Sequence, residues 1–436
     1  MQLIALGFLV IIGTGTVLLM LPCATQSGES AGFLNALFTA TSSTCVTGLI
    51  VQDTATFWSL FGQIVIITLI QIGGLGFMTV STLFLSIVRH RFGLREREVM
   101  AESISATHID SIVSLTHMIL VGTAAIEGAG ALLLSIRFVP EFGFWKGIYY
   151  SIFHSVSAFC NAGFDLMGIK GPYSSLVSYS DDILVNVTIM ALIVIGGIGF
   201  LVWRDIYHNG FHWKRYHLHT RLVFIATGIL IFGGALCFYF LEMNNLEADM
   251  SFREQVLTSF FSSVTARTAG FNTTDTALLT PASKLLTIVL MFIGGSSGST
   301  AGGIKTTTVA VILLSWLSGL RGGQGVYILG RKIPEKATRQ AILVFCTNLT
   351  LALLGAFLIC GMQQLNLVDI LFEVFSAIGT VGMSTGITRA LSPASCLIIV
   401  FLMYCGRVGS VSFVVSLAEK RARPQVTYPE ESITVG

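Results

Sequence analysis

The sequence predicts an all-α integral membrane protein built from four pseudo-repeats around one central axis. Hydrophobic residues make up 53% of the 436-residue chain and charged residues only 11%, whereas a soluble domain carries about 25% charged residues. Four stretches also share one pattern, a small or polar pair followed by a glycine and a large apolar residue. They are Val46-Thr47-Gly48-Leu49, Asn161-Ala162-Gly163-Phe164, Thr268-Ala269-Gly270-Phe271 and Thr380-Val381-Gly382-Met383.

Two further features recur at corresponding positions before and after each of these stretches. A phenylalanine stands ten residues before each of the glycines, at Phe38, Phe153, Phe260 and Phe372. A second glycine motif follows each stretch; the four are Gly73-Gly74-Leu75-Gly76-Phe77, Gly196-Gly197-Ile198-Gly199-Phe200, Gly294-Gly295-Ser296-Ser297-Gly298 and Gly406-Arg407-Val408-Gly409. Four copies in one register are hard to produce by chance, so the sequence predicts a fourfold internal repeat.

Eight apolar segments supply the membrane spans of these repeats. A spanning helix needs roughly 20 mostly apolar residues, and such segments cover residues 3–22, 60–88, 112–136, 183–203, 219–241, 282–320, 338–361 and 392–417. The first is expected to be a spanning helix and not a signal peptide, because it has no basic leading region. The segment 282–320 is too long for one span and contains glycine and serine, so we expect eight transmembrane helices, one of them broken. The repeats then cover 1–88, 112–203, 219–320 and 338–436, the last with a C-terminal tail.

Basic residues predict the orientation of the chain in the membrane. Of the 25 Lys and Arg residues, 16 fall in the links between repeats and in the tail, and the positive-inside rule makes these segments cytoplasmic. They are Arg89, Arg91, Arg95, Arg97, Arg204, Lys214, Arg215, Arg221, Arg321, Arg331, Lys332, Lys336, Arg339, Lys420, Arg421 and Arg423. The opposite face is net negative, which either concentrates cations at an outer mouth or only follows from the same topological bias.

The four stretches have the character of a cation pore. Each follows a short helical segment, at 31–43, 145–158, 253–265 and 367–378, and is predicted to re-enter the membrane as a loop. Non-helical backbone inside a membrane must face protein or a water-filled cavity. The short helices would direct partial negative charge at the axis, and loop carbonyl oxygens can replace the hydration shell of potassium. The alternative for any single glycine is an ordinary turn or close helix packing.

We therefore predict a selectivity filter around one central pore, with a potassium ion at its backbone carbonyls. Its candidate residues are Val46, Thr47, Gly48, Asn161, Ala162, Gly163, Thr268, Ala269, Gly270, Thr380, Val381 and Gly382.

The broken span predicts an intramembrane gate. Five glycines and three serines among residues 294–303 destabilise helix in the middle of a span. Ile304 separates Gly303 from Lys305, so the pattern of a phosphate-binding loop fails. A flexible loop over 294–306 that plugs the cavity is preferred to a structural kink. The candidate gate residues are Gly294, Gly295, Ser296, Ser297, Gly298, Ser299, Thr300, Gly302, Gly303, Lys305 and Arg407.

Arg407 joins this set because an intramembrane charge is costly and marks a functional site by default. It is expected to bond the carbonyls of the loop. Lys305 either joins Arg407 or reaches the cytoplasm.

Other polar residues have more ordinary expected roles. The eight cysteines show no metal-ligand spacing and are expected to pack as small apolar residues. Asp53, Asp165 and Asp275 either form an outer cation vestibule or cap the following helices. Arg267 is expected to point away from the filter and brace its short helix, Glu127 to make a structural hydrogen bond, and His154 to pack. Nothing in the sequence indicates an enzyme, an organic cofactor or a nucleic-acid partner.

Three phrases of the chain resemble the superfamily of potassium transporters that includes TrkH, KtrB and the plant HKT proteins. They are 159–164 (FCNAGF), 266–272 (ARTAGFN) and 294–308. Four repeats without an extra leading pair of helices, and the tail 428–436, resemble KtrB more than TrkH. Members usually have a basic N-terminal segment, whereas here the first span starts almost at Met1.

The resemblance implies a potassium-uptake subunit in the cytoplasmic membrane of a prokaryote, with one pore per subunit. It also implies a homodimer regulated by a cytoplasmic ring of nucleotide-binding subunits, KtrA-like, and a gate at the interrupted span. Serine at the first filter position accompanies sodium preference in HKT relatives, so Gly48 favours potassium; transport of sodium stays open.

Two other classes of function remain as alternatives. A secondary cation transporter, sodium-coupled or sodium-permeable, would often show two inverted repeats, whereas this chain shows four parallel ones. A membrane-embedded enzyme would need paired carboxylates, a His/Cys constellation or a metal motif in its spans, and the sequence shows none.

Overall fold

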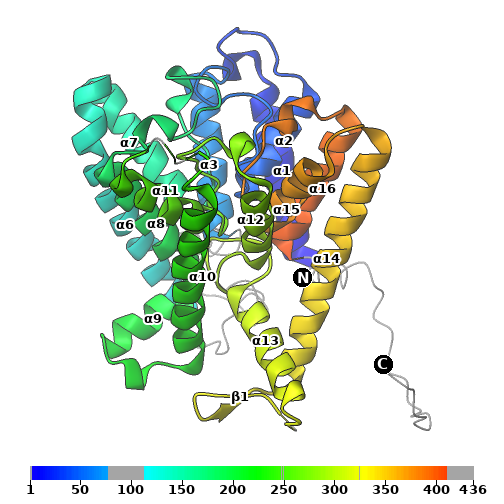
Figure 1. Ribbon diagram of the computed structural model, residues 1–436. Helices are drawn as coiled ribbons and strands as arrows, with labels where there is room; N and C mark the ends of the chain where they lie inside the picture. The colour runs from blue at the N-terminus through cyan, green and yellow to red at the C-terminus, as the bar shows by residue number, and fades with distance from the viewer. Residues whose placement is uncertain (1, 77–111, 247, 249, 324, 410–436) are drawn as a thin grey trace.

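The computed structural model describes residues 2–76, 112–246, 248, 250–323 and 325–409. Within these residues the chain is almost entirely helical, and Figure 1 shows the long helices side by side in one bundle. The exception among the described residues is an antiparallel hairpin of β1 (Tyr327–Ile328) and β2 (Arg331–Lys332), which lies at the same end of the bundle as α9. The predicted repeat boundaries at 88 and 436, and the basic residues at 89–97 and 420–423, lie outside the described residues.

Each repeat contributes a first helix, a short second helix and a further apolar helix. The first repeat contains α1 (Gln2–Met20), α2 (Phe33–Thr44) and α3 (Leu60–Leu75), and the second contains α6 (Ile112–Phe142), α7 (Phe144–Phe159), α8 (Ile183–Gly197) and α9 (Phe200–Asn209). The third contains α10 (Leu218–Glu242), α11 (Phe252–Thr265), α12 (Pro281–Ile293) and α13 (Thr306–Leu320), and the fourth α14 (Glu335–Met362), α15 (Leu367–Gly379) and α16 (Pro393–Val408). Short 3₁₀ turns lie in the connections: η1 (Pro22–Ala24), η3 (Met167–Ile169), η4 (Val177–Tyr179), η5 (Trp213–Arg215), η6 (Thr276–Leu278) and η7 (Ile387–Ala390).

The helix that follows each loop, α3, α8, α12 or α16, begins and ends in the same way in all four repeats. The residue before its first turn, Ser59, Asp182, Thr280 or Ser392, caps it with a side-chain oxygen that accepts a backbone N–H of that turn. Its end is marked by a glycine with positive φ: Gly76, Gly199, Gly294 or Gly409. A glycine takes this conformation at no steric cost, so the second glycine motifs predicted from the sequence are helix terminators.

Two helix pairs are interrupted where the sequence predicted one broken span. The predicted break in 282–320 is present, since α12 stops at Ile293 and α13 starts at Thr306. The segment 183–203, however, is not one straight span, because α8 and α9 are bent by 92° to one another. The physical reason is Gly199, whose φ of 102° ends the helix.

Long apolar helices cover the outside of the bundle. Three described helices are long and apolar enough to cross a membrane, Leu115–Phe142, Leu218–Glu242 and Glu335–Met362, and the bent pair makes a possible fourth. Their outward side chains include exposed Leu132, Phe232 and Phe357, a pattern suited to lipid contact.

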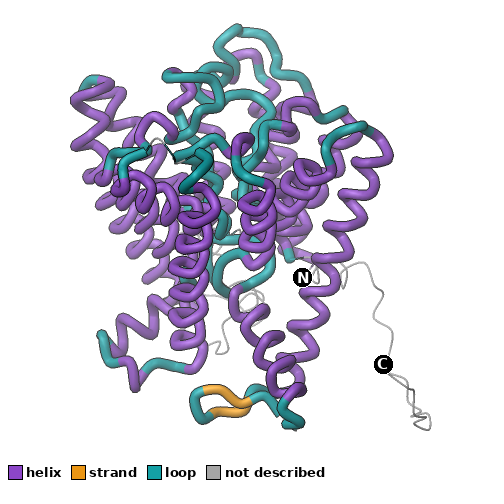
Figure 2. The backbone as a smooth tube through the Cα atoms, viewed as in Figure 1, coloured by secondary structure: helices purple, strands orange, loops and turns teal. Residues whose placement is uncertain are grey.

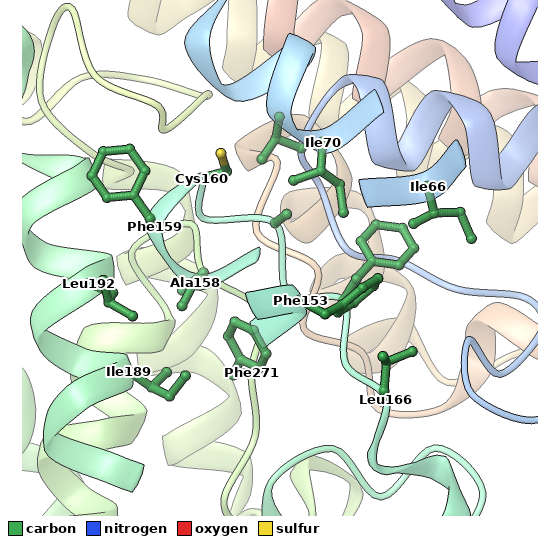
Figure 3. Close-up of a cluster of buried hydrophobic side chains, with 14 of the residues drawn as sticks. Ile66, Ile70, Phe153, Ala158, Phe159, Cys160, Leu166, Ile189, Leu192 and Phe271 are labelled. Atoms are coloured by element: carbon green, nitrogen blue, oxygen red, sulfur yellow. The ribbon is translucent and has the colours of Figure 1, made fainter. Parts of the chain in front are cut away.

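The four short helices α2, α7, α11 and α15 form the interior. Phe38, Phe153 and Phe372 are fully buried, and Figure 3 shows Phe153 within a cluster that also includes Ile66 of α3 and Phe271. In the third repeat the buried ring is Phe261, while Phe260 lies edge-on against Phe232 of α10. Figure 2 shows non-helical backbone running through the middle of the bundle, enclosed by helices, where protein must satisfy its polar groups.

Candidate functional site

The four glycine loops, defined as residues 46–49, 161–164, 268–271 and 380–383, form a closed ring. A Cβ added to Gly48 would lie 2.4 Å from the carbonyl oxygen of Ala162, and one added to Gly163 would lie 2.6 Å from that of Ala269. The series continues from Gly270 to Val381 at 2.4 Å and from Gly382 back to Thr47 at 2.1 Å. Each repeat thus packs its glycine against a carbonyl of the next, in the order one to four and back to one.

The backbone of each glycine loop alternates between unusual and ordinary conformations. The glycines have φ values of 92°, 67°, 82° and 92°. The residue two positions earlier also has positive φ in every loop: Val46 at 57°, Asn161 at 59°, Thr268 at 79° and Thr380 at 51°. Positive φ is uncommon for residues other than glycine, and strain of this kind gathers at functional sites.

Hydrogen bonds tie the glycine loops back to the short helices. The N–H groups of Thr47, Ala162 and Val381 donate to the carbonyls of Ser42, Ser157 and Ser376 at 2.8, 2.8 and 2.9 Å, and that of Ala269 donates to Thr265 at 2.9 Å. The hydroxyls of Ser42 and Ser376 accept from Gly48 and Gly382. These bonds use the N–H groups of the loops and none of the four carbonyl oxygens that pack on the glycines.

The chain between α12 and α13, residues 294–305, lies against the second and fourth repeats. The N–H of Ser296 donates to the carbonyl of Gly197 at 3.0 Å, and that of Thr300 to Gly196 at 3.3 Å. The N–H of Gly303 donates to the carbonyl of Gly406 at 3.3 Å. A Cβ added to Gly302 would lie 2.1 Å from the hydroxyl of Thr380, so the segment touches a glycine loop and leaves no room there for a side chain.

Two cations hold the carbonyls of this segment. Arg407 of α16 donates to the carbonyl of Thr300 with one nitrogen, and with the other to Gly73 and, at 3.2 Å, to Gly74. Lys305 donates to the carbonyls of Ala301 and Gly302 at 2.7 and 3.1 Å. The bonding of Arg407 to the loop agrees with its prediction, and Lys305 bonds the loop itself. Among the described residues, no carboxylate lies within 4.0 Å of either cation.

The three aspartates that follow the first three glycine loops cap turns. Asp53 accepts from the N–H groups of Ala55, Thr56 and Tyr173. Asp165 accepts from Met167, and Asp275 from Ala277. Of the two readings of these residues, the structure favours capping. Burial raises the pKa of Asp165, in the loop between α7 and α8, to about 7, opposed by the Met167 N–H and assisted by the neighbouring Asp53 carboxylate.

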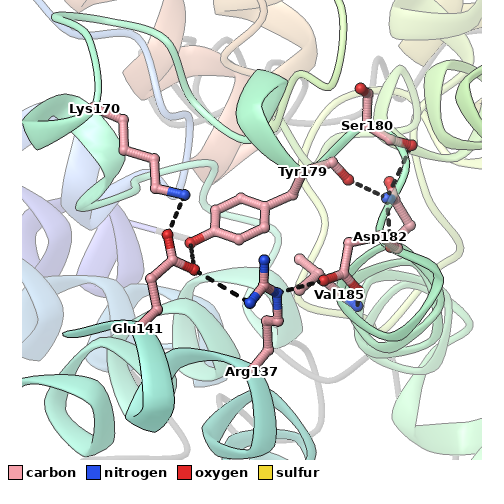
Figure 4. Close-up of polar contacts among 8 residues, drawn as sticks. Arg137, Glu141, Lys170, Tyr179, Ser180, Asp182 and Val185 are labelled. Carbon is pink, nitrogen blue, oxygen red and sulfur yellow. Dashed lines mark hydrogen bonds and ion pairs between the residues drawn. The ribbon is translucent and has the colours of Figure 1, made fainter. Parts of the chain in front are cut away.

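A polar cluster fixes the loop between α7 and α8 to α6 (Figure 4). Glu141 pairs with Lys170 and accepts from the Tyr179 hydroxyl at 3.0 Å, and Arg137 donates to Asp182 at 2.8 Å. The Lys170 ammonium lies 3.9 Å from the centre of the Tyr179 ring. Burial, with the Glu141 carboxylate beside it, raises the pKa of Tyr179 well above its usual value.

The remaining predicted residues take structural positions. Arg267 donates to Thr227 of α10 at 3.4 Å, so its side chain is directed at that helix. Glu127 accepts from Gln71 at 3.2 Å, as expected of a structural hydrogen bond. The described Cys, His, Asp and Glu side chains include no group that could hold a metal ion. His154 and Glu373 were missed as site residues, although both bond to chain just beyond a glycine loop.

Comparisons with known proteins show the family and the fold of the chain. A family model described as TrkH, cation transport protein, matches residues 2–425. The potassium/sodium uptake protein NtpJ of Enterococcus hirae is 42% identical, covering 100% of this chain and 97% of the relative. The Ktr system potassium uptake protein B of Bacillus subtilis is 40% identical, covering 100% and 96%. The crystal structure of the potassium transporter TrkH from Vibrio parahaemolyticus shares the fold, with a TM-score of 0.75 over 94% of this chain and 84% of that one, at 17% identity.

Proposed function

The chain belongs to the TrkH family of cation transport proteins, and we propose that it takes up potassium across the bacterial cytoplasmic membrane through the ring of glycine loops. The observation that carries the proposal is the closed series of four glycine-to-carbonyl contacts. A ring of backbone carbonyls is the arrangement that replaces the water around a potassium ion in a selectivity filter. The fold, the family and the multi-pass membrane location are those of a transporter and not of an enzyme.

The short helices support cation selectivity. Helices α2, α7, α11 and α15 each end directly before a glycine loop, so their carboxyl ends carry partial negative charge toward the ring. Gly48 occupies the first of the four glycine positions, where a serine side chain would intrude on the carbonyl of Ala162. We therefore propose potassium as the preferred ion, held at the carbonyls of the twelve filter residues.

Residues 294–306 and Arg407 are the proposed gate. In the structure this segment is held by Arg407 and Lys305, and it touches the fourth glycine loop at Thr380. Two positive charges beside the pathway add an electrostatic barrier to a cation. Conduction then requires the segment to leave its present hydrogen bonds, which include bonds to α8 and α16.

Regulation is proposed to come from outside this chain. The Bacillus subtilis relative is named as part of a Ktr system, which supports a homodimer with a KtrA-like ring of nucleotide-binding subunits on the cytoplasmic side. The basic surface of the described links, including Lys214, Arg215 and Arg331, suits such a partner.

A second function, transport that is permeable or coupled to sodium, is favoured by one observation. The Enterococcus hirae relative, 42% identical over its length, is named a potassium/sodium uptake protein. Sodium flux through the purified protein, measured with and without a potassium gradient, separates permeation from coupling.

The test of the proposed function is cation flux into liposomes that hold the purified chain. We expect potassium-selective flux, and its loss in Gly163→Val and Gly270→Val, whose side chains would collide with the next repeat. Gly28→Val is the matched control, because Gly28 also has positive φ but has no atom within 4 Å of an added Cβ. No flux in the parent, or equal flux in all three variants, would refute the filter.

A further inference from the structure

One position on the short helices stands at the same distance from the loop glycine in all four repeats. It lies nine residues before the loop glycine and is occupied by Thr39, His154, Phe261 and Glu373. All four residues are at most 2% exposed. In the second and fourth repeats the side chain is long and polar, and it bonds to residues directly beyond the loop.

His154 of α7 bridges its own helix and the exit of the second glycine loop. Its Nδ1 lies 2.7 Å from the carbonyl oxygen of Tyr150, and its Nε2 accepts the N–H of Leu166 at 3.3 Å. A carbonyl can only accept and an amide N–H can only donate, so Nδ1 carries the proton and the imidazole is neutral. The ring also lies 6.4 Å, between centres, from Phe271 of the third loop.

Glu373 of α15 likewise connects its helix to the exit of the fourth glycine loop, with its two carboxylate oxygens. One carboxylate oxygen accepts the Ser384 hydroxyl at 2.7 Å, and the other accepts the Thr388 hydroxyl. The two hydroxyl oxygens lie 2.9 Å apart, and that of Ser384 accepts the N–H of Gly386 at 2.9 Å. The carbonyl of Ser384 accepts from Thr276, which belongs to the third repeat. The exit of the fourth loop is thereby tied to its own helix and to its neighbour.

The first and third repeats hold their loops by contacts that the second and fourth repeats also make. In the third, the hydroxyl of Thr265 donates to the carbonyl of Phe271 at 2.6 Å, as that of Ser157 does to Phe164 at 2.7 Å in the second, while Phe261 provides only an apolar ring. In the first, Ser42 accepts from Gly48, as Ser376 does from Gly382 in the fourth. Because the ring runs in the order of the repeats, the second and fourth loops stand opposite one another across the axis.

We propose that His154 and Glu373 are positioning residues for ion selection, which hold two opposite sides of the carbonyl ring at a fixed spacing. The inference rests on the proposed function and deepens it. Leu166 follows Gly163 by three residues and Ser384 follows Gly382 by two, so a shift of either segment moves a ring carbonyl. A ring that relaxes inward accommodates the smaller sodium ion, and potassium loses its advantage.

The experiment measures potassium and sodium flux in the same liposomes and compares their ratio between variants. His154→Leu and Glu373→Leu remove the acceptors, and we expect the potassium-to-sodium ratio to fall by roughly fivefold or more, as is typical when a buried hydrogen-bond partner is lost. His154→Gln can still accept from Leu166 and should keep most of the ratio. Thr39→Val and Phe261→Leu, at the same register, are the controls and should leave it unchanged.

A second set of variants guards against misfolding. Thr388→Val is nearly isosteric and removes one donor to Glu373, so it should lower the ratio without loss of protein. Equal losses of both fluxes, with the ratio unchanged, would show that the two residues only stabilise the fold and would overturn the inference. Absence of selective flux in the parent would instead overturn the proposed function, so the two failures are distinguishable.

Discussion

Replacing Arg407 with alanine should open the pathway. In the structure the guanidinium bonds the carbonyl of Thr300 on one side and those of Gly73 and Gly74 on the other. It therefore joins the proposed gate segment to α3. Alanine removes both halves of this bridge and one of the two positive charges that the structure places there.

The expected magnitude follows from the lost bonds. A hydrogen bond from a charged group contributes about 1.5–3 kcal/mol, and every 1.4 kcal/mol is a factor of ten. Loss of the bond to Thr300 alone should shift the segment toward its released position by roughly 10- to 100-fold. Potassium flux should rise by at least about tenfold where release of the segment limits conduction.

The assay is initial potassium flux into liposomes that contain equal amounts of folded protein. Arg407→Lys is the matched control, because an ammonium keeps the charge but cannot fork between Thr300 and α3. If the bonds matter most, lysine should behave nearly like alanine; if the charge matters most, it should behave like the parent. Unchanged or reduced flux in a well-folded Arg407→Ala protein would refute the role of this residue in the gate.

Three further predictions concern the ring, the segment and the outer loop. Gly48→Ser should make sodium compete with potassium roughly tenfold better, since the added Cβ would press on Ala162. Gly28→Ser is the control, and unaltered potassium selectivity in Gly48→Ser would disprove the assignment of Gly48 to the filter. Deletion of residues 296–303 should raise potassium flux, and a folded variant with less flux than the parent would contradict a plug. Burial raises the pKa of Asp165 from 3.8 to about 7, so the folded protein keeps a proton there that the unfolded chain has released, and stability falls as pH rises from about 4 to 7. Asp165→Asn should flatten the dependence of the melting temperature on pH, with Asp275→Asn as control. The same pH dependence in parent and Asp165→Asn would exclude a role of Asp165 in it.

The parts of the fold that were predictable from the sequence are those fixed by local backbone demands. A glycine with positive φ has few substitutes, so the four ring glycines and the glycines that end α3, α8, α12 and α16 are visible as a repeated pattern. The four short helices were predicted to within two residues of their observed bounds. Each is an apolar segment, and the glycine loop that follows it marks its end.

What could not be predicted depends on contacts between segments distant along the chain. His154 was expected only to pack, because its acceptor role is visible only when Leu166 is folded back onto it. Glu373 was not recognised at all, since its partners lie 11 and 15 residues further on. The 92° bend between α8 and α9 was missed because Gly199 sits in a motif that elsewhere only ends a helix.

The position of the gate in the third repeat has a packing explanation. In the other three repeats the first glycine of the second motif packs on the carboxyl end of its own short helix. An added Cβ would lie 2.0 Å from the Thr44 carbonyl at Gly73, 2.0 Å from that of Phe159 at Gly196, and 2.2 Å from that of Ile378 at Gly406. These contacts lock each helix end against the filter it supports.

Gly294 makes no equivalent contact in the structure. The nearest atoms to its added Cβ are the carbonyl oxygens of Ile304 and Gly302, at 2.6 and 3.2 Å, both within the gate segment itself. Its helix therefore ends on the segment instead of on the short helix of its own repeat. The third repeat is thus the one in which the second glycine motif does not fasten its own filter helix, and this makes it the favourable place in the fold for a moving element.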